Sequence, residues 1–362
     1  MLKIIHGADF HLDSPFSVLT PDQAARRREE QRELLDRLAR LAREQKADLV
    51  LLAGDLLDSQ RCYRETAQAL ARALGDIPCP VFIAPGNHDY YSPRSVYATL
   101  DWPDNVHIFR DPSIQRVDLP RLNCAVYGRA FTAPHQEESP LSGFRAEGAE
   151  GTVRLMCLHG DTAPQSGYGP IAPEDMAASG LDYLALGHIH QCSGLNRAGN
   201  TFWAYPGCPE GRGFDELGEK GVLYVEAEPG NVTAQFVPLC RRKYEILTVD
   251  VTGGSSALDA VNAALPGDTR EDIYRLILTG EGEAPDLPAL ERALAPRFYG
   301  LTLTDRTRLP RDLWARREED TLTGLFLQTM WDKCQSAPDD QTCQLAVRFG
   351  LAALENGEDL AL

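Results

Sequence analysis

The chain has 362 residues, of which 43% are hydrophobic and 25% charged, a composition typical of a globular protein with two or three domains. No apolar run approaches the roughly 20 residues that cross a bilayer, and the first residues lack the pattern of a signal peptide. Nine scattered cysteines without a C-x-x-C pair exclude a zinc ribbon and indicate reduced thiols. We therefore expect a cytoplasmic protein that contacts no membrane.

The net charge of −17 argues against unaided binding to nucleic acid, because such binding uses a basic face that displaces counterions from phosphates. Basic clusters occur at residues 26–28, 241–243 and 306–317. Each is explained equally well as a solvated helix face or a linker. Contact with a polyanion is therefore expected to be local, metal-mediated or dependent on a partner.

Residues 1–240 alternate short β-branched apolar runs with helical patterns, which predicts an α/β domain. Helices are expected at about 21–45 and 63–74, the first with Thr20 as its N-cap. Two apolar runs around residues 229–231 predict a β-hairpin.

Residues 241–306 predict a second, small α/β domain without candidate ligands. Its expected elements are strand 244–251, helix 256–265, strand 273–278, helix 287–294 and strand 301–304. Residues 307–362 form a predicted helical region with two amphipathic helices after Glu318. Their apolar faces carry Leu322, Leu325, Phe326 and Met330 in the first helix, and Cys343, Ala346, Val347 and Leu354 in the second. These faces would pack either on the chain's own core or on a partner, and the pattern supports the two alternatives equally.

Five predicted strands of the first domain share one design, since each ends in a polar side chain that can bind a metal ion. The motifs at the five strand ends are Asp9-Phe10-His11, Gly54-Asp55, Gly86-Asn87-His88, His159-Gly160 and Gly187-His188-Ile189-His190. The carboxyl ends of strands in an open α/β sheet are where ligands gather. Together the motifs predict a metal centre, although each alone would be weak.

Mixed oxygen and imidazole ligands suit manganese, iron or zinc. The glycines that precede several ligands allow the backbone to approach an ion closely. The remaining histidines are expected elsewhere: His6 in a sheet, and His107 and His135 in loops or at the surface.

These motifs together resemble the calcineurin-like metallophosphoesterases. The opening Ala8–Phe16, the segment Tyr205–Arg212 and the later Gly218–Gly221 resemble the SbcD-type DNA nucleases within that superfamily, and most of all their YhaO-like bacterial branch. The resemblance implies an α/β fold, namely a four-layer αββα sandwich over residues 1–240. It also implies a small α/β capping domain at 241–306 and C-terminal helices at 307–362.

The resemblance implies two divalent metal ions, most simply manganese, with iron, zinc or magnesium as alternatives. The first ion would be held by Asp9, His11, Asp55 and His190, and the second by Asp55, Asn87, His159 and His188. Asp55 would bridge the ions, whose joint action activates a water and clamps the phosphoryl oxygens. His88 would act on the leaving oxygen.

Three aspartates, Asp58, Asp89 and Asp161, are candidates for orienting the ligating imidazoles. Roles as helix caps or turn residues explain them equally well.

The resemblance implies a metal-dependent DNA nuclease, exonuclease or endonuclease, that serves DNA repair or processing at the nucleoid. An SbcC-like coiled-coil ATPase would be its partner, and the chain itself would be a homodimer whose contact lies near residues 61–74 and after Asn87. Four residues, Cys62, Tyr63, Ala67 and Leu70, would form part of an apolar face there, and burial in the chain's own core explains them equally well. The alternative is a phosphodiesterase or phosphatase of the same superfamily that acts on a small molecule. A scaffold with a dead site has no support, because every candidate ligand is present.

Overall fold

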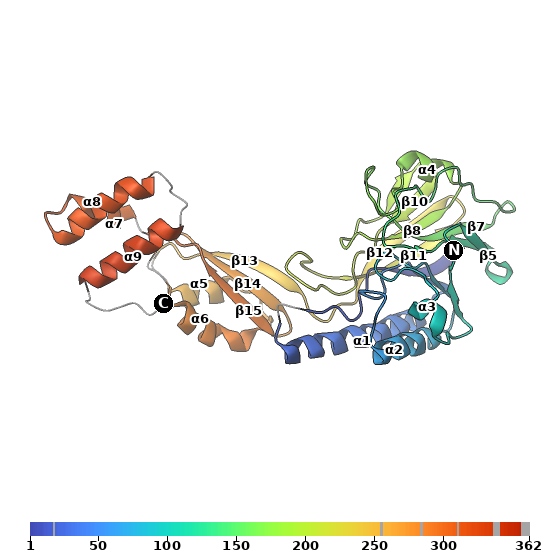
Figure 1. The fold of residues 1–362 in the computed structure, drawn as a ribbon, viewed down its shortest axis with the longest axis horizontal. Coiled ribbons are helices and arrows are strands. Elements are labelled where there is room, and N and C mark those ends of the chain that lie inside the picture. Colours follow the sequence, from blue (N-terminus) through green and yellow to red (C-terminus); the bar gives the residue numbers. More distant parts are fainter. Residues whose placement is uncertain (17–18, 254–255, 283–284, 310, 336–340, 356–362) are drawn as a thin grey trace. The chain divides into compact units, whose positions relative to one another are not determined.

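The computed structural model describes residues 1–16, 19–253, 256–282, 285–309, 311–335 and 341–355 (Figure 1). The chain divides into two compact units, Met1–Lys243 and Tyr244–Leu362. Across the described ranges, every helix is too short or too polar to cross a membrane.

The first unit contains two six-stranded sheets over its described residues. The first sheet has, in order, β12 (Asn231–Pro238), β11 (Gly221–Glu228), β1 (Leu2–Gly7), β2 (Leu49–Leu52), β3 (Val81–Ile83) and β4 (Val106–Ile108). The second has β5 (Gln115–Leu119), β6 (Cys124–Gly128), β7 (Val153–His159), β8 (Tyr183–Gly187), β10 (Thr201–Ala204) and β9 (Asn196–Ala198). The central strands run parallel, so their carboxyl ends share one edge. The predicted hairpin is formed by β11 and β12.

Side chains alternate along the central strands and so separate three apolar cores. In β2, for example, Val50 and Leu52 face the helical core, whereas Leu49 and Leu51 face the core between the two sheets. A third core covers the outer face of the second sheet. Three cores between four layers confirm the predicted αββα sandwich.

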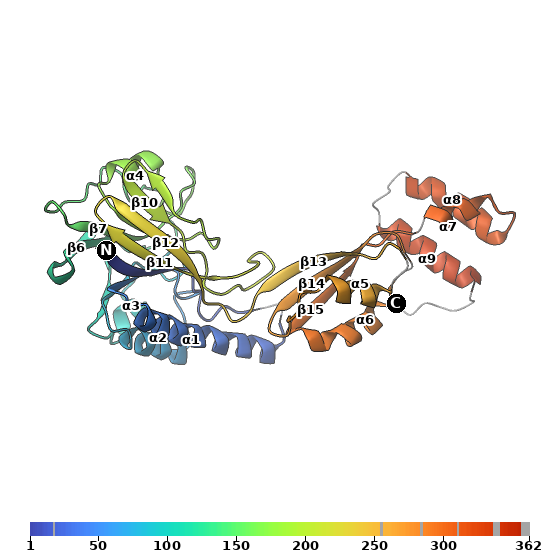
Figure 2. The same cartoon turned by 180° about the vertical axis from the view of Figure 1, so that it is seen from behind.

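Helices form the two outer layers of this unit, as Figures 1 and 2 show. Those on the first sheet are α1 (Pro21–Glu44), α2 (Arg64–Gly75) and α3 (Val96–Thr99), and α4 (Pro173–Ala178) packs on the second. A 3-10 turn, η1 (Pro120–Leu122), precedes β6. The predicted N-cap is confirmed, because the Thr20 side chain accepts a hydrogen bond from the Gln23 backbone N–H, and the Gln23 side chain accepts one from the Thr20 backbone N–H.

His6 joins the two sheets in the core between them. It lies on β1, where its Nε2 donates to the Leu186 carbonyl over 3.0 Å and its Nδ1 accepts from the Tyr183 hydroxyl over 2.8 Å. Burial lowers the pKa of this imidazole to about 3, although the Leu186 carbonyl opposes the shift. The predicted place of His6 in a sheet is confirmed, and its ring is neutral at physiological pH.

Because the pKa of His6 is depressed on folding, the unfolded chain binds one proton more than the folded chain between about pH 3 and pH 6.5. The stability from this site is therefore complete above about pH 6.5 and is lost as the pH falls toward 3. We expect His6→Gln to make the free energy of unfolding less dependent on pH, by up to about 1.4 kcal/mol per pH unit in that window. Urea denaturation of both metal-free proteins at several pH values measures this, and equal slopes would contradict it.

The second unit begins with a parallel sheet of β13 (Tyr244–Asp250), β14 (Ile273–Thr279) and β15 (Gly300–Asp305). Helices α5 (Ala257–Ala264) and α6 (Leu287–Leu294) connect the strands, and a 3-10 turn, η2 (Ala295–Arg297), follows α6. Each predicted element between residues 244 and 304 is confirmed to within one residue at both ends.

Three further helices follow in this unit, α7 (Arg311–Ala315), α8 (Leu322–Gln335) and α9 (Gln341–Glu355), with a 3-10 turn, η3 (Arg316–Glu318), after α7. They share a core around Leu327 and Val347. Residues 356–362 of the predicted helical region lie outside the described residues.

The expectation that all nine cysteines are reduced thiols is wrong for one pair. Cys334 at the end of α8 and Cys343 near the start of α9 form a disulfide. The hairpin of the two helices brings their Cα atoms to 5.7 Å, within the normal range for a disulfide. The other seven cysteines are free.

Candidate metal centre

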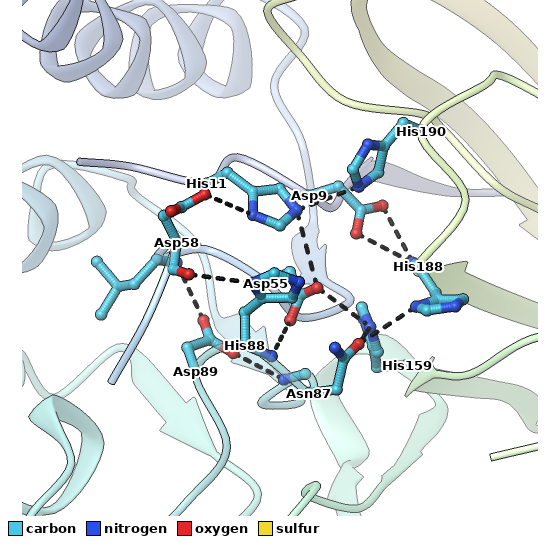
Figure 3. Close-up of polar contacts among 12 residues, drawn as sticks. Asp9, His11, Asp55, Asp58, Asn87, His88, Asp89, His159, His188 and His190 are labelled. Atoms are coloured by element: carbon cyan, nitrogen blue, oxygen red, sulfur yellow. Dashed lines mark hydrogen bonds and ion pairs between the residues drawn. The ribbon is translucent and has the colours of Figure 1, made fainter. Parts of the chain in front are cut away.

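The polar side chains of the five strand ends meet in one place, beyond the carboxyl ends of β1, β2, β3, β7 and β8 (Figure 3). The residues brought together there are Asp9, His11, Asp55, Asn87, His88, His159, His188 and His190. The first five come from the first sheet and the last three from the second. The site therefore lies where the facing sheets end together, and most of its members are buried.

The backbone of the site is strained at four candidate ligands. Asp9, His11, Asp55 and His188 have φ angles of 55°, 45°, 50° and 116°, a region that residues with a β-carbon rarely occupy. Each such conformation costs about 1–3 kcal/mol and persists only where its surroundings enforce it. Here the Asp9 amide donates to the Gly54 carbonyl and the His11 amide to the Asp55 carbonyl, over 3.0 and 2.9 Å. These bonds lock the loops after β1 and β2 together.

The first group of donor atoms belongs to Asp9, His11 and His190, whose ligand atoms lie within 4.8 Å of one another. Nε2 of His11 is 3.1 Å from Nε2 of His190. The backbone N–H of His188 donates to both carboxylate oxygens of Asp9 over 3.1 Å and so fixes that side chain.

The second group belongs to Asp55, His159 and His188, with Asn87 beside them. Asn87 Oδ1 lies 2.9 Å from His159 Nε2 and 3.2 Å from His188 Nδ1. Asp55 Oδ2 lies 3.5 Å from His159 Nε2 and 3.8 Å from His11 Nε2. This single oxygen therefore lies between the two groups.

The ring nitrogens of two histidines show that the donor set suits cations. Nδ1 of His159 donates to the Ala53 carbonyl over 2.8 Å, and Nδ1 of His190 lies 2.7 Å from the Glu216 carboxylate. A neutral imidazole that donates through Nδ1 presents a lone pair at Nε2. These lone pairs face other acceptors, Asn87 Oδ1 in one group and His11 Nε2 in the other. Acceptors that converge in this way fit a bound cation.

The electrostatics of the site agree with this fit. Burial lowers the pKa of His11, His159 and His188 to about 4, so all three rings are neutral and able to ligate at physiological pH. Burial, and then repulsion from Asp55, raises the pKa of Asp9 well above its usual range. Two buried carboxylates beside neutral imidazoles form a combination that manganese, iron or zinc ions would stabilise.

Two glycines allow the close approach of the ligand loops. A β-carbon on Gly86 would lie 2.2 Å from Asp55 Oδ1, and one on Gly54 would lie 2.6 Å from His159 Nδ1. Gly54 also has a φ of +87°, which favours glycine. Both glycines thus make room for ligand side chains, and the expected close approach of the backbone to an ion stays a prediction.

His88 is the exposed member of the site. Its backbone N–H donates to Asp55 Oδ1 over 2.9 Å, and its Nδ1 donates to the Asp58 carbonyl over 3.0 Å. Its ring meets that of His11 edge to face, with centroids 4.8 Å apart. Because Nδ1 is engaged, Nε2 is the ring nitrogen through which His88 can exchange a proton with a ligand.

The three candidate orienting aspartates differ in what they contact. Asp58 Oδ1 lies 3.3 Å from His11 Nδ1, on the side expected of an orienting group but without the geometry of a hydrogen bond. The Asp89 carboxylate instead accepts from two backbone N–H groups, of Gly86 and Leu57, and from the Tyr97 hydroxyl, and so ties the loops after β2 and β3.

Asp161 is a turn residue in the structure. Its Oδ2 lies 3.8 Å from His188 Nε2, too far for a hydrogen bond, and its Oδ1 accepts from the Ala163 amide. The expectation of His107 in a loop or at the surface is wrong, because it lies half-buried on the strand β4, where its ring contacts the stacked rings of Phe82 and Phe109.

Two residues of the site were not singled out by sequence analysis, Glu216 and Arg212. Glu216 Oε1 lies 2.7 Å from His190 Nδ1, and the Arg212 guanidinium binds Glu216 over 2.8 Å. Burial alone would raise the pKa of Glu216, but hydrogen bonds from His190 and Arg212 hold it well below its usual range, so Glu216 is ionised. The sequence offered two signals, the opposite-charge pair four residues apart in a glycine-rich loop and the place of Arg212 at the end of the segment Tyr205–Arg212.

A four-layer α/β sandwich that gathers two adjoining sets of carboxylate, amide and imidazole donors defines a class of proteins, the metal-dependent hydrolases of phosphoesters. The chain belongs to the calcineurin-like phosphoesterase family, whose model matches residues 2–192. Members of this family bind divalent metal ions and hydrolyse phosphoester bonds.

Several characterised and uncharacterised relatives are similar to the chain. The uncharacterised metallophosphoesterase YhaO of Bacillus subtilis is 30% identical over 263 residues, which span 69% of this chain and 64% of YhaO. The DNA double-strand break repair protein Mre11 of Aeropyrum pernix is 29% identical over 284 residues, spanning 73% of this chain and 68% of the relative. The SbcD component of the SbcCD nuclease from Staphylococcus epidermidis is 24% identical over 371 residues, spanning 92% of this chain and 94% of the relative.

Proposed function

We propose that the protein is a two-metal-dependent DNA nuclease that hydrolyses phosphodiester bonds, as an exonuclease, an endonuclease or both, in DNA repair or processing. The observation that carries the proposal is a pair of donor groups with Asp55 Oδ2 between them and the exposed His88 alongside. Relatives named as a nuclease and as a DNA repair protein support the choice of substrate.

In this proposal one ion is held by Asp9, His11, Asp55 and His190, and the other by Asp55, Asn87, His159 and His188. Manganese suits the mixed oxygen and imidazole donors, with iron, zinc and magnesium as alternatives. Bound ions would supply an activated water and charge stabilisation for the phosphoryl oxygens. The chain contributes the positions of its donors, and His88 protonates the leaving oxygen through Nε2.

In this proposal binding to DNA needs help from a partner, because arginines of two of the three basic clusters are engaged within the chain. Arg27 and Arg242 are 0% and 4% exposed, and both bind the buried Glu30. Arg241 also contacts an acidic side chain, that of Glu33. A local basic contact at residues 241–243, the cluster nearest the domain boundary, is therefore weak.

The partner in this proposal is an SbcC-like coiled-coil ATPase that binds the apolar groove of α8 and α9. The groove is lined by Leu322, Leu325, Phe326, Thr329, Gly350, Ala353 and Leu354. Leu322 and Leu325 are 68% and 61% exposed, so this face of α8 is not packed on the chain's own core. The predicted faces are divided between the two alternatives, because Met330, Cys343 and Val347 pack in the chain's own core and only the part around Leu322 and Leu325 is open to a partner.

A homodimer is part of the same proposal. Of the α2 residues considered for the contact, Ala67 and Leu70 are buried within the chain's own core, whereas Tyr63 is 57% exposed. Light scattering at micromolar concentration would report the dimer, and a monomer would contradict it.

The alternative function is hydrolysis of a small phosphodiester, which the net charge of −17 favours. An assay with manganese on single-stranded, double-stranded and hairpin DNA, with and without the ATPase partner, tests the choice. Cleavage of DNA supports the nuclease. Turnover of bis(p-nitrophenyl) phosphate without cleavage of any DNA, even with the partner, would select the alternative.

The isolated chain is expected to bind duplex DNA weakly and with little dependence on salt. Each neutralised phosphate adds about −0.9 to the slope of log affinity against log salt, so about three contacts or fewer give a slope no steeper than about −2.7. Titration of labelled duplex at several salt concentrations measures the slope. Arg241→Glu is expected to change the slope by less than about 0.9, the contribution of one phosphate contact. Tight, steeply salt-dependent binding would reveal a basic groove and contradict this expectation.

A further inference from the structure

The side chain of Arg212 connects two carboxylates that each face a histidine of the first donor group. This inference rests on the proposed two-metal site and concerns the three residues Arg212, Glu216 and Asp58, called here the arginine clamp. Nη2 of Arg212 donates to Glu216 over 2.8 Å, and its Nη1 donates to Asp58 over 3.3 Å. The Arg212 amide also donates to Glu216, over 2.7 Å.

On one side of the clamp, Glu216 orients His190. Its Oε1 lies 2.7 Å from His190 Nδ1, and the Glu216 side chain is only 5% exposed. A buried carboxylate at Nδ1 fixes the ring and its tautomer, so that the lone pair of Nε2 faces the other donors.

On the other side, Asp58 faces His11. Asp58 Oδ1 lies 3.3 Å from His11 Nδ1 and accepts the hydroxyl of Ser14 over 3.0 Å. His11 Nε2 in turn lies 3.1 Å from His190 Nε2. A single guanidinium therefore holds the groups behind both imidazoles of the first donor group.

The second donor group is held in a different way. His159 is fixed by a backbone carbonyl, that of Ala53, and His188 approaches Asp161 only to 3.8 Å. The described contacts of the arginine clamp reach neither of these rings. The clamp thus acts on one group and not on the other.

The loop that carries Arg212 is held by a side chain of α1. Nη2 of Arg27 on α1 donates to the Gly211 carbonyl over 3.0 Å, and its Nη1 donates to Glu210 over 2.8 Å. Arg27 and Glu210 are 0% and 2% exposed. A buried ion pair therefore fixes the loop that carries Arg212, which limits the movement of the Arg212 side chain.

We propose that Arg212 and Glu216 are positioning residues that set the metal affinity of one site alone, the site formed by Asp9, His11 and His190. They act through His190 and His11 and need not touch the ion. The two ions would then differ in how tightly they are bound, in a way that this loop controls.

Titration of the metal-free protein with Mn²⁺, followed by calorimetry and by electron paramagnetic resonance, tests the proposal without any substrate. Glu216→Gln and Arg212→Met are expected to weaken one of two Mn²⁺ sites about 10–100-fold and to leave the other unchanged. Glu226→Gln on β11 is the matched control and is expected to change neither site. Thermal unfolding of each metal-free variant confirms that it is folded.

His190→Ala identifies the site concerned, because it removes a ligand of the first group. If Glu216 acts through His190, adding Glu216→Gln to His190→Ala weakens the first site no further than His190→Ala alone does. Equal weakening of both sites by Glu216→Gln, or no weakening of either, would overturn the positioning role. Wild-type protein that binds fewer than two Mn²⁺ ions would instead overturn the proposed function itself.

Discussion

Asp55→Ala is expected to remove both metal ions and to lower the rate of phosphodiester hydrolysis by about 10³-fold or more. The reason is the position of Oδ2, which lies 3.5 Å from His159 in one donor group and 3.8 Å from His11 in the other. A carboxylate in this position can bridge two ions, whereas each imidazole nitrogen serves one. Losing Asp55 therefore weakens both sites together, while losing a histidine weakens one.

Elemental analysis after dialysis measures the Asp55 variant directly, alongside Asp118→Ala as the control. Asp118 lies on β5, outside the donor groups, and its side chain is 57% exposed. The control is expected to keep two ions and full activity. Retention of one tightly bound ion by a folded Asp55→Ala protein would show that Asp55 belongs to a single site, contrary to the bridging role.

His88→Ala is expected to keep both ions and yet lose about 10²–10⁴-fold in rate, the range of general acid catalysis. The separation follows from the contacts of this residue. Its ring is exposed and held through Nδ1 by the Asp58 carbonyl, and its backbone, unchanged by the substitution, still donates to Asp55 Oδ1. The substitution thus removes a proton donor and leaves the support of the bridging carboxylate in place.

The leaving group provides a sharper test of the role of His88. A nitrophenolate departs without being protonated, so the variant should hydrolyse bis(p-nitrophenyl) phosphate with a much smaller loss than it shows on DNA. Rates at saturating substrate, with metal content measured on the same samples, compare the two. Equal losses on both substrates, or loss of an ion, would make His88 a binding residue or a ligand instead.

The sequence patterns by themselves predicted an α/β domain and the residues that meet at the edge of its sheets, whereas the four layers of the sandwich were implied by the family resemblance. Strands such as Leu49–Leu52 and Tyr183–Gly187 are short, apolar and followed at once by polar side chains. Parallel strands place their carboxyl ends together, so five such strands predict one site without knowledge of any contact. The elements between residues 244 and 304 were predictable for a related reason, since the change from strand to helix periodicity marks each boundary.

Local sequence patterns also predicted the glycines before the ligands and the N-cap of α1. Gly54 and Gly86 directly precede Asp55 and Asn87, and the contacts that exclude a β-carbon there involve their near neighbours in the site. Thr20 and Gln23 cap one helix end from three residues apart. The cap can be recognised from adjacent residues, whereas the contacts of the glycines with Asp55 and His159 come from distant segments of the chain.

Only the tertiary structure decided which charged residues form ion pairs inside the fold. Arg27 and Arg242 belong to two basic clusters in the sequence, yet both bind Glu30 in the structure. Glu30 and Arg242 are 212 residues apart in the chain. Burial of a guanidinium depends on a partner that satisfies it, and no periodicity reports that partner. The same holds for Cys334 and Cys343, whose disulfide depends on how α8 and α9 meet.

The support of the ligands was likewise a tertiary result. Asp89 was expected behind an imidazole and instead receives the Gly86 and Leu57 amides, whereas Glu216 was not considered and lies 2.7 Å from His190. A ligand is marked by residue type at a strand end, but its orienting group comes from whichever loop packs behind it. The folded loops determine which group orients each ligand, and spacing along the chain does not predict it.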